Sequence, residues 1–186
     1  MKRAFDLLLG VMLFILLTIS MLLIAILIRR TSKGPALYWS DRTGKNNKIF
    51  KMPKFRSMLT GTPAVATHLL DNPETCLSPI GGFLRSTSLD ELPQLFSVLR
   101  GDMSFVGPRP ALYNQDDLIS LRTEKGADKL LPGITGWAQV NGRDELSIPD
   151  KVALDVEYLN HQSFWFDMKI LWMTFLKVVK RDGVSH

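Results

Sequence analysis

Cysteine is almost absent from this chain. Cys76 is the single one among 186 residues, so an intramolecular disulfide and a cysteine-rich zinc site are both excluded, which fits a reducing compartment. Internal repeats and motifs typical of nucleic-acid binding are absent as well. The net charge of +5 therefore indicates an anionic partner, but charge alone does not choose between nucleic acid, anionic lipid and a phosphorylated substrate.

Charge is also missing from the segment Leu7–Ile28. A straight helix over these 22 residues would be about 33 Å long, enough to cross a hydrocarbon core. A signal peptide is disfavoured because the run ends at Arg29–Arg30 without a small-residue cleavage site. Basic residues flank both ends, and both ends therefore prefer the cytoplasm. We expect a re-entrant helix rather than a full span, and divide the chain into a membrane-inserted part, 1–33, and a cytosolic catalytic domain, 34–186.

Two adjacent carboxylates, Asp90 and Glu91, lie where a helix should begin. Ser88 and Glu91 have the spacing of a capping box, and Asp90 is an alternative N-cap with Pro93 in the first turn. Either arrangement places both acids among exposed N–H groups, so Asp90 is expected to stay ionised and available as a nucleophile or metal ligand. Gly101 suits the residue after the helix C-terminus.

Basic residues precede and follow this acidic pair. Strands at 36–39 and 49–51 around the turn 44–47 predict a β-hairpin that leads to Lys54 and Arg56. Those two residues suit either a solvated strand edge or anion binding. Arg109 lies between two prolines that restrict its backbone. We favour phosphate binding for Arg109, with a tie between its loop and the helix carboxylates as the alternative. Arg85 lies five residues before Asp90.

A second rigid turn begins at Pro132 and is followed by Gln139, Asn141 and Arg143. In an extended segment these three side chains alternate onto one face. They would there either contact a nucleotide or sugar, or satisfy the backbone of the turn.

Two helices are expected at the C-terminal end. The segment 149–158 has a helical period with core positions at Val152, Leu154, Val156 and Leu159. The segment 164–181 mixes aromatic residues with lysines and suits an amphipathic helix in the membrane interface. A core helix using Leu171, Phe175 and Val178 is the alternative for it.

Four segments in order, 54–58, 85–94, 101–110 and 132–143, follow one apolar N-terminal segment. With them the chain resembles the bacterial sugar transferase family, the small monotopic phosphoglycosyl transferases, over nearly its whole length. In that family a Ser-Pro pair breaks the membrane helix. Thr18 and Ile19 stand at the equivalent positions here, so the bend would depend on back-bonding by the hydroxyls of Thr18 and Ser20. The fold class expected is α/β (α+β), mostly helical, with a re-entrant membrane helix, a short β-hairpin and interfacial amphipathic helices around a small cytosolic domain.

The resemblance implies a reaction and roles for individual residues. A phosphosugar would pass from a UDP-sugar to undecaprenyl phosphate at the cytoplasmic face of the bacterial inner membrane, with release of UMP, as the first membrane step of a glycoconjugate pathway. Asp90 would be the nucleophile that forms an aspartyl phosphosugar, and Glu91 would hold Mg²⁺. The remaining expected site residues are Lys54, Arg56, Arg85, Arg109, Gln139, Arg143 and Asp155. For Asp155, paired with Tyr158 in the family's Asp-x-x-Tyr pattern, site support and substrate contact stay open.

Three other readings compete with this one. A lipid phosphatase or a transferase of another class also needs carboxylates and arginines, a membrane scaffold needs no nucleophile, and a basic single-pass protein would bind DNA or RNA in a salt-sensitive way. The expected partners are a UDP-sugar, undecaprenyl phosphate and membrane lipid, without nucleic acid. The sequence specifies neither the sugar nor the oligomeric state.

Overall fold

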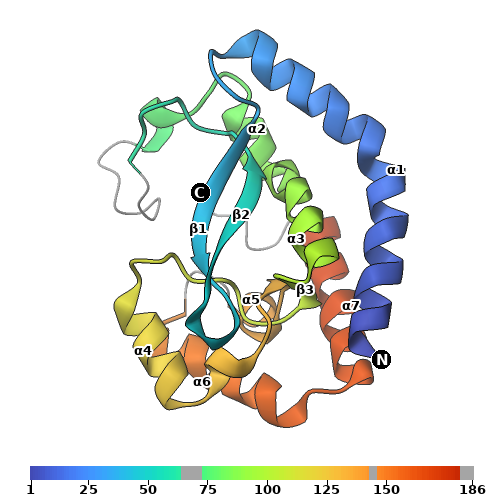
Figure 1. The fold of residues 1–186 in the computed structure, drawn as a ribbon, viewed down its shortest axis with the longest axis vertical. Helices are drawn as coiled ribbons and strands as arrows, with labels where there is room; N and C mark the ends of the chain where they lie inside the picture. The colour runs from blue at the N-terminus through green and yellow to red at the C-terminus, as the bar shows by residue number, and fades with distance from the viewer. Residues whose placement is uncertain (64–72, 143–145, 181–186) are drawn as a thin grey trace.

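The computed structural model describes residues 1–63, 73–142 and 146–180 (Figure 1). The fold is α+β and mostly helical, as the sequence predicts. Its helices and strands, in chain order, are α1 Lys2–Thr31, β1 Leu37–Thr43, β2 Ile49–Phe55, α2 Gly81–Ser86, α3 Leu95–Arg100, β3 Ser104–Val106, α4 Asp116–Glu124, β4 Gly133–Thr135, α5 Trp137–Val140, α6 Ile148–His161 and α7 Phe164–Lys180. Short 3₁₀ helices are η1 Lys45–Asn47, η3 Pro73–Cys76, η4 Leu89–Gln94 and η5 Ala127–Lys129.

The strands β1 and β2 form the predicted antiparallel hairpin, and each strand is longer than the sequence pattern indicates. Pairing runs from Leu37 opposite Phe55 to Thr43 opposite Ile49. At the tip, Asn46 and Asn47 take the left-handed conformation, with φ of 54° and 58°, which asparagine tolerates better than most residues. The hairpin runs across the front of the molecule in Figure 1 and leads the chain toward α2 and α3.

Three apolar clusters form the core, and two of them hold the elements around the acidic pair. The larger one joins β2, α3, β3, α6 and α7, with Val98, Met103 and Ile170 fully buried. The smaller one joins α1, β2 and α2 through residues that include Ile28, Phe55 and Leu84. Together the clusters fix β2 and α3 in place. The chain between α2 and α3 carries the acidic pair, so this core positions it.

The helix α1 packs along both clusters. Leu9 and Leu13 in its first half contact the larger cluster, while Met21 and Ile24 in its second half belong to the smaller one. Figure 1 shows that α1 changes direction near its middle and curves over α3 toward the hairpin. Thr18 donates its hydroxyl to the Phe14 carbonyl at 2.6 Å, the back-bonding that bends helices without proline.

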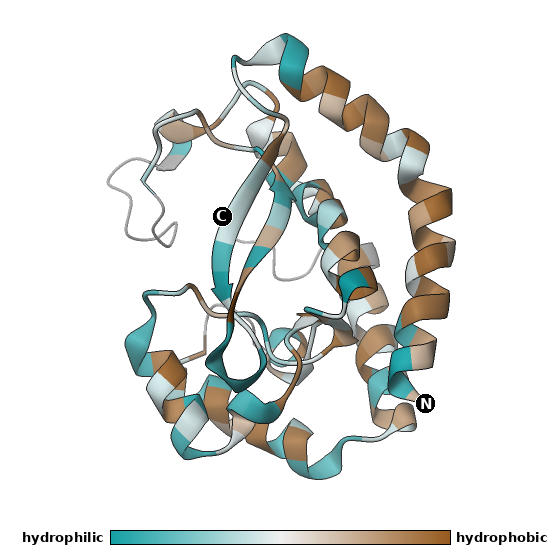
Figure 2. Ribbon diagram, in the orientation of Figure 1, coloured by the Kyte–Doolittle hydropathy of each residue, from teal (hydrophilic) through white to brown (hydrophobic). Residues whose placement is uncertain are grey.

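The other side of α1 is apolar and uncovered. Among the described residues α1 is the one helix long and apolar enough to cross a membrane, and only 17% of its most apolar window is buried in the protein. Figure 2 shows hydrophobic residues along nearly its whole length. An apolar helix surface left open to solvent is unfavourable, so this side of α1 is suited to lipid.

Polar side chains at the start of α1 bind the domain. Lys2 Nζ lies 2.6 Å from Asp167 Oδ2 and 3.1 Å from Tyr158 Oη. The Tyr158 hydroxyl donates to Asp167 Oδ1 at 2.6 Å. Burial, followed by the hydrogen bond to Asp167, raises the pKa of Tyr158, which keeps this hydroxyl protonated as a donor. The start of α1 is thereby joined to α6 and α7.

Arg3 and Asp6 attach the same end of α1 to α3 and β3. Arg3 donates to the carbonyl oxygens of Val98 and Leu99 at 2.6 and 2.9 Å, so it adds side-chain donors at the C-terminus of α3, where the Val98 carbonyl also accepts from the Gly101 N–H. The buried Asp6 carboxylate accepts from the Ser104 hydroxyl and the Phe105 amide, both at 3.1 Å.

Two glycine-containing turns pack backbone against backbone. Strand β3 pairs in parallel with β4, and the segments after them, around Gly107 and Gly136, lie in contact. A Cβ atom on Gly136 would collide with the Gly107 carbonyl oxygen, and one on Gly133 with the Gly107 amide. Only glycine permits this approach, so these residues set the position of the Pro108–Pro110 turn.

The last two helices differ from expectation in their buried faces. In α6 the fully buried residues are Val152, Asp155 and Tyr158, so two of the three are polar, whereas Leu154 is only half-buried. In α7 Ile170 is fully buried and Leu171 packs against the same cluster, as the core-helix alternative predicts, whereas Phe175 and Val178 are exposed. A core role for those two residues is therefore wrong. The exposed side of α7 carries aromatic and apolar side chains, which are Trp165, Trp172, Phe175 and Val178.

Candidate active site

The acidic pair lies in η4, a short 3₁₀ helix between α2 and α3, and both acids are in its first turn. The predicted capping box does not form. Ser88 takes a left-handed conformation, with φ of 55°, and makes no side-chain cap. The chain needs this sharp turn because α2 ends only at Ser86. The end of α3 is as predicted, since Gly101 follows it with φ of 94°.

Asp90 is buried, with 9% of its surface exposed. Burial raises its pKa above the ordinary aspartate value of 3.8. The positive charges of Lys54 and Arg85 act in the opposite direction, and the neighbouring Glu91 adds to the rise. A backbone hydrogen bond lowers the pKa of Asp90, as expected at a helix start, but the loss of hydration outweighs it. Two cations nonetheless stand close enough to act on this carboxylate.

Glu91 connects two segments that are distant in the sequence. Its Oε1 atom lies 2.9 Å from Lys54 Nζ on β2 and 3.4 Å from Arg109 Nη2 in the Pro108–Pro110 turn. The Glu91 and Lys54 side chains are mostly buried, with 18% and 16% exposed, while Arg109 is 36% exposed. The alternative in which Arg109 ties its loop to a helix carboxylate describes this contact.

Arg42 is a further cation of this site that sequence reasoning missed. It lies on β1 and donates to the Pro110 carbonyl at 3.1 Å and to the Ser40 hydroxyl at 3.0 Å. Burial lowers its pKa to about 10, with the charge of Arg109 contributing in the same direction and that of Glu91 opposing. Two guanidinium groups are thus held close to one carboxylate, an arrangement with room for a further anion.

Arg56 and Arg85 differ in what they act on. Arg85 is in the last turn of α2, and its charge acts on Asp90. Arg56 is buried and donates instead to Ser32 and to the Lys33 carbonyl, just after α1. The structure therefore brings Arg85 to the acidic pair, while the hydrogen bonds of Arg56 join the hairpin to the end of α1.

The segment after Pro132 is not extended. Residues Trp137–Val140 form the short helix α5, so Gln139 and Asn141 do not alternate on one strand face. Asn141 donates to the Trp137 carbonyl at 2.8 Å and so satisfies local backbone. Both polar side-chain atoms of Gln139 are buried without a hydrogen-bond partner. Arg143 lies outside the described residues.

Asp155 is fully buried and pairs with Arg122, a second arginine that the sequence did not point to. Arg122 Nη2 lies 2.7 Å from Asp155 Oδ2 and its Nε 2.9 Å from the same oxygen. Burial raises the pKa of Asp155 although Arg122 opposes the rise. Arg122 also donates to the Arg109 carbonyl at 2.9 Å. Of the two roles left open for Asp155, these contacts favour site support.

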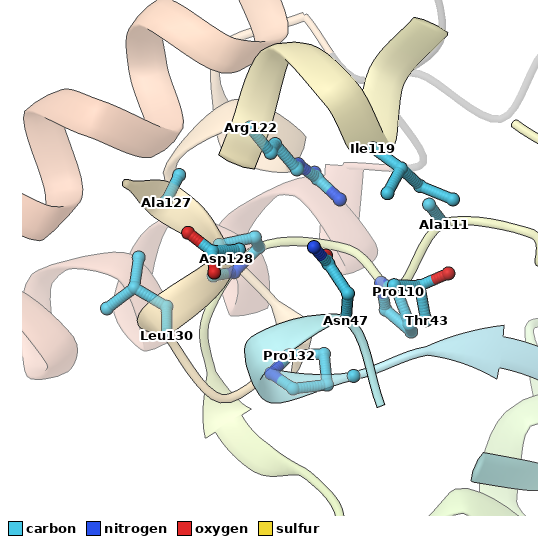
Figure 3. A pocket seen from close by; sticks show the side chains of 12 residues that line it. Thr43, Asn47, Pro110, Ala111, Ile119, Arg122, Ala127, Asp128, Leu130 and Pro132 are labelled. Atoms are coloured by element: carbon cyan, nitrogen blue, oxygen red, sulfur yellow. The ribbon is translucent and has the colours of Figure 1, made fainter. Parts of the chain in front are cut away.

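A small hollow lies next to this arginine (Figure 3). It is lined by the hairpin tip, by α4 and η5, and by Pro108 and Pro110. Figure 3 shows Arg122 extending from α4 over the space between Asn47 and Pro110. Neither carboxylate of the acidic pair lines it. The hollow therefore lies beside the Pro108–Pro110 turn, on which Arg109 is carried.

The chemistry of the site follows from these positions. A buried carboxylate beside cations is suited to act as a nucleophile toward a phosphorylated group, whose charge the basic residues would balance. The residues assembled around the pair are Lys54, Arg85, Arg109 and the unpredicted Arg42. Within the described ranges no three His, Cys, Asp or Glu side chains converge. The fold and the site thus define a membrane-associated α+β domain in which an acidic pair is surrounded by cations.

Comparison with known proteins identifies the family. The model of the bacterial sugar transferase family matches residues 1–181, and the chain belongs to this family. It is 41% identical to an undecaprenyl-phosphate glucose phosphotransferase of Komagataeibacter xylinus, over 100% of this chain and 36% of that protein. It is 40% identical to the uncharacterized sugar transferase EpsL of Bacillus subtilis, over 100% of this chain and 91% of that protein.

A third relative, the undecaprenyl-phosphate galactose phosphotransferase of Salmonella typhimurium, is 36% identical over 98% of this chain and 41% of its own length. The chain thus spans about two fifths of the Komagataeibacter and Salmonella proteins and most of the Bacillus protein.

Proposed function

We propose that this chain transfers a phosphosugar from a UDP-sugar to undecaprenyl phosphate and releases UMP. The observation that carries the proposal is the acidic pair itself, with Asp90 buried beside the charges of Lys54 and Arg85 and Glu91 bridging Lys54 to Arg109. Membership of the family and the lipid-suited surface of α1 support a reaction in which one substrate is a lipid phosphate.

The reaction would proceed in two displacements. An Asp90 carboxylate oxygen attacks the sugar-proximal phosphorus, the bond from that phosphorus to the UMP oxygen breaks, and an aspartyl phosphosugar forms. A phosphate oxygen of the lipid then attacks the same phosphorus. The bond to Asp90 breaks, which regenerates the carboxylate and gives undecaprenyl-diphosphate-sugar.

The cations of the site would bind the diphosphate and balance charge in the transition state. Arg109 is suited to this because part of its guanidinium is exposed and planar groups match phosphate oxygens. Lys54 and Arg85 oppose the burial-induced rise in the pKa of Asp90 and so keep more of the nucleophile ionised. Burial of Asp90 also removes water from the attacking oxygen.

The donor set of the site fits Mg²⁺. Two adjacent carboxylates suit a hard cation that takes one or two protein ligands and completes its shell with substrate phosphates and water. Glu91, with Asp90 beside it, would hold the ion. When bound, Mg²⁺ neutralises diphosphate charge and improves UMP as a leaving group.

We also propose that α1 enters the membrane and returns to the same, cytoplasmic face. Its 30 residues would extend about 45 Å if straight, yet both ends are bonded to one domain, Arg3 to α3 and Ser32 to Arg56. The basic residues at both ends favour the cytoplasm. The site would then lie at headgroup level, where the lipid phosphate is found.

Intact mass of the protein tests the function. Detergent- or nanodisc-held protein is incubated with Mg²⁺ and single UDP-sugars without lipid, beginning with glucose and galactose because relatives are named for them. We expect an adduct of phosphosugar mass in the wild type and none in Asp90→Asn. Catalytic UMP release should require undecaprenyl phosphate as well. Lipid-dependent turnover without any adduct would contradict the covalent route, and sugar-independent phosphate release from the lipid would indicate a phosphatase.

A further inference from the structure

Two arginines hold successive carbonyl groups of the Pro108–Pro110 turn. Arg122 on α4 donates to the Arg109 carbonyl at 2.9 Å, and Arg42 on β1 donates to the Pro110 carbonyl at 3.1 Å. The two prolines have no N–H groups, so the turn forms fewer hydrogen bonds of its own. Side chains from outside the turn therefore determine much of its position.

Arg122 is itself fixed from α6. Its Nε and Nη2 atoms both donate to Asp155 Oδ2, at 2.9 and 2.7 Å, while Nη1 bonds the Arg109 carbonyl. The Arg122 side chain is 12% exposed and that of Asp155 1%. Three nitrogen atoms of the planar guanidinium therefore donate hydrogen bonds, two to Asp155 and one to the Arg109 carbonyl. A lysine has a single nitrogen at the end of a flexible stem and cannot bridge the same two acceptors with this geometry.

The position of this carbonyl determines where the Arg109 side chain points. That side chain extends the other way, to Glu91 Oε1 at 3.4 Å, and remains 36% exposed. Arg122 bonds Asp155 and the Arg109 carbonyl, and it lines the hollow beside the turn, which neither acid lines. Its bond to the Arg109 carbonyl gives it a route to the acidic site through the turn.

We infer that Arg122, oriented by Asp155, is a positioning residue that holds the Pro108–Pro110 turn so that Arg109 meets the phosphoryl group being transferred. The inference rests on the proposed function for what Arg109 binds. The position of the turn itself does not depend on that function. A misplacement of a binding group by about 1 Å can cost on the order of 100-fold in rate, so a secondary contact of this kind matters to the reaction.

A double-mutant cycle on activity is the first test. Wild type, Arg122→Lys, Arg109→Lys and the double variant are compared for kcat and KM of UMP release with both substrates. We expect Arg122→Lys to lower kcat/KM by about tenfold, chiefly through kcat. The double variant should match Arg109→Lys within about twofold, because independent sites would instead multiply their effects. Multiplicative losses, or full activity in Arg122→Lys, would overturn the inference.

Hydrogen exchange of the turn is the second test and needs no substrate. In the peptide covering residues 107–112, we expect exchange in Arg122→Lys to be faster by at least about fivefold, while the α7 peptides keep their wild-type rates. The matched control is Arg100→Lys, because Arg100 is 68% exposed and pairs only with Asp102 on the surface. It should change neither activity nor exchange. Unchanged exchange in Arg122→Lys refutes the positioning role.

The two tests separate the two proposals. If the wild type forms no adduct and releases no UMP, the proposed function fails, while the exchange result still decides whether Arg122 holds the turn. If Arg122→Lys does not fold, the same exchange measurement on Asp155→Asn replaces it, because that variant releases Arg122 from α6. Equal exchange in Asp155→Asn and wild type then overturns the inference.

Discussion

Lys54 Nζ on β2 lies 2.9 Å from Oε1 of Glu91, the acid that follows the candidate nucleophile. The same lysine opposes the rise in the pKa of Asp90. One cation thus acts on both acids of the pair. The ionisation of Asp90 depends on these neighbouring charges. The rate of the reaction and the stability of the fold should therefore vary with pH and with substitutions that remove one charge.

The rate of adduct formation should fall at acid pH. The nucleophile must be ionised, and burial raises the pKa of Asp90 above 3.8, so the acid limb should lie above that of an ordinary aspartate. Lys54→Met removes a charge that lowers this pKa and should move the limb to higher pH. Single-turnover mass spectrometry from about pH 4.5 to 8 measures the acid limb of the rate profile for the wild type and for Lys54→Met. An unchanged acid limb in Lys54→Met would mean that Lys54 does not influence the ionisation of Asp90.

Asp90→Asn should be more stable than the wild type at neutral pH. The pKa of Asp90 is higher in the folded chain than in the unfolded one, so the folded state loses stability as pH rises through that window. Replacing an ionised buried group by an amide removes this cost. We expect a gain of about 1 kcal/mol, or roughly 2–4 °C in Tm, that shrinks toward acid pH.

Thermal unfolding of both proteins at about pH 4 and 7 checks this prediction. The control is Asp41→Asn, because Asp41 is 43% exposed and forms a surface pair with Lys51. A lower Tm for Asp90→Asn at neutral pH would mean that its attraction to the neighbouring cations outweighs the cost of burial.

Asp155→Asn should lower stability. It leaves the Arg122 guanidinium, 12% exposed, without its counter-charge, and breaking a buried pair is costly. Burial already opposes ionisation of Asp155, so we expect a loss of about 2 kcal/mol, below the usual range for such pairs. The exposed Glu157 lies on the same helix, and Glu157→Gln should stay within about 0.5 kcal/mol of wild type. Equal melting temperatures for the two variants would contradict the structural role of the pair.

Both ends of α1 should be accessible from one side of the membrane. Ala4 and Lys33 are exposed residues near its two ends, and Cys76 can be replaced by serine to give a background without thiols. We expect Ala4→Cys and Lys33→Cys to react with an impermeant maleimide in inverted vesicles and not in intact spheroplasts. Labelling of the two positions from opposite sides would establish a full crossing.

Several parts of the site were predictable from the sequence because local chemistry identifies them. The pair Asp90–Glu91, the restricted Arg109 and the hairpin leading to Lys54 carry signals within a few residues of themselves, and Gly101 ends α3 as expected. The predicted capping box, by contrast, does not form, because Ser88 turns the chain sharply between two short helices.

Other parts depend on contacts that no local pattern records. Arg42 and Arg122 reach the Pro108–Pro110 turn from elements 68 and 13 residues away from the carbonyls they bind. Side chains two residues apart on a strand point to the same face, so Arg56 would lie beside Lys54 if β2 continued. Strand β2 ends at Phe55, and the Arg56 side chain instead bonds Ser32.

The buried face of α6 shows why polar cores are hard to predict. Apolar spacing favoured Leu154 as a core position, yet the helix buries Asp155 and Tyr158. Each of these polar groups is satisfied by a residue from another element, Arg122 on α4 and Asp167 on α7. A sequence pattern does not show such partners, because they meet only after folding.

The attachment of α1 also bears on how the protein is made. Leu9, Leu13, Met21 and Ile24 pack into the same clusters that hold α3 and the hairpin, and Arg3 caps α3 itself. The core of the domain is therefore complete only when α1 is in place. A chain shortened to remove the membrane segment would lack part of its own interior, and a water-soluble version of the enzyme would need that interior rebuilt and not merely trimmed.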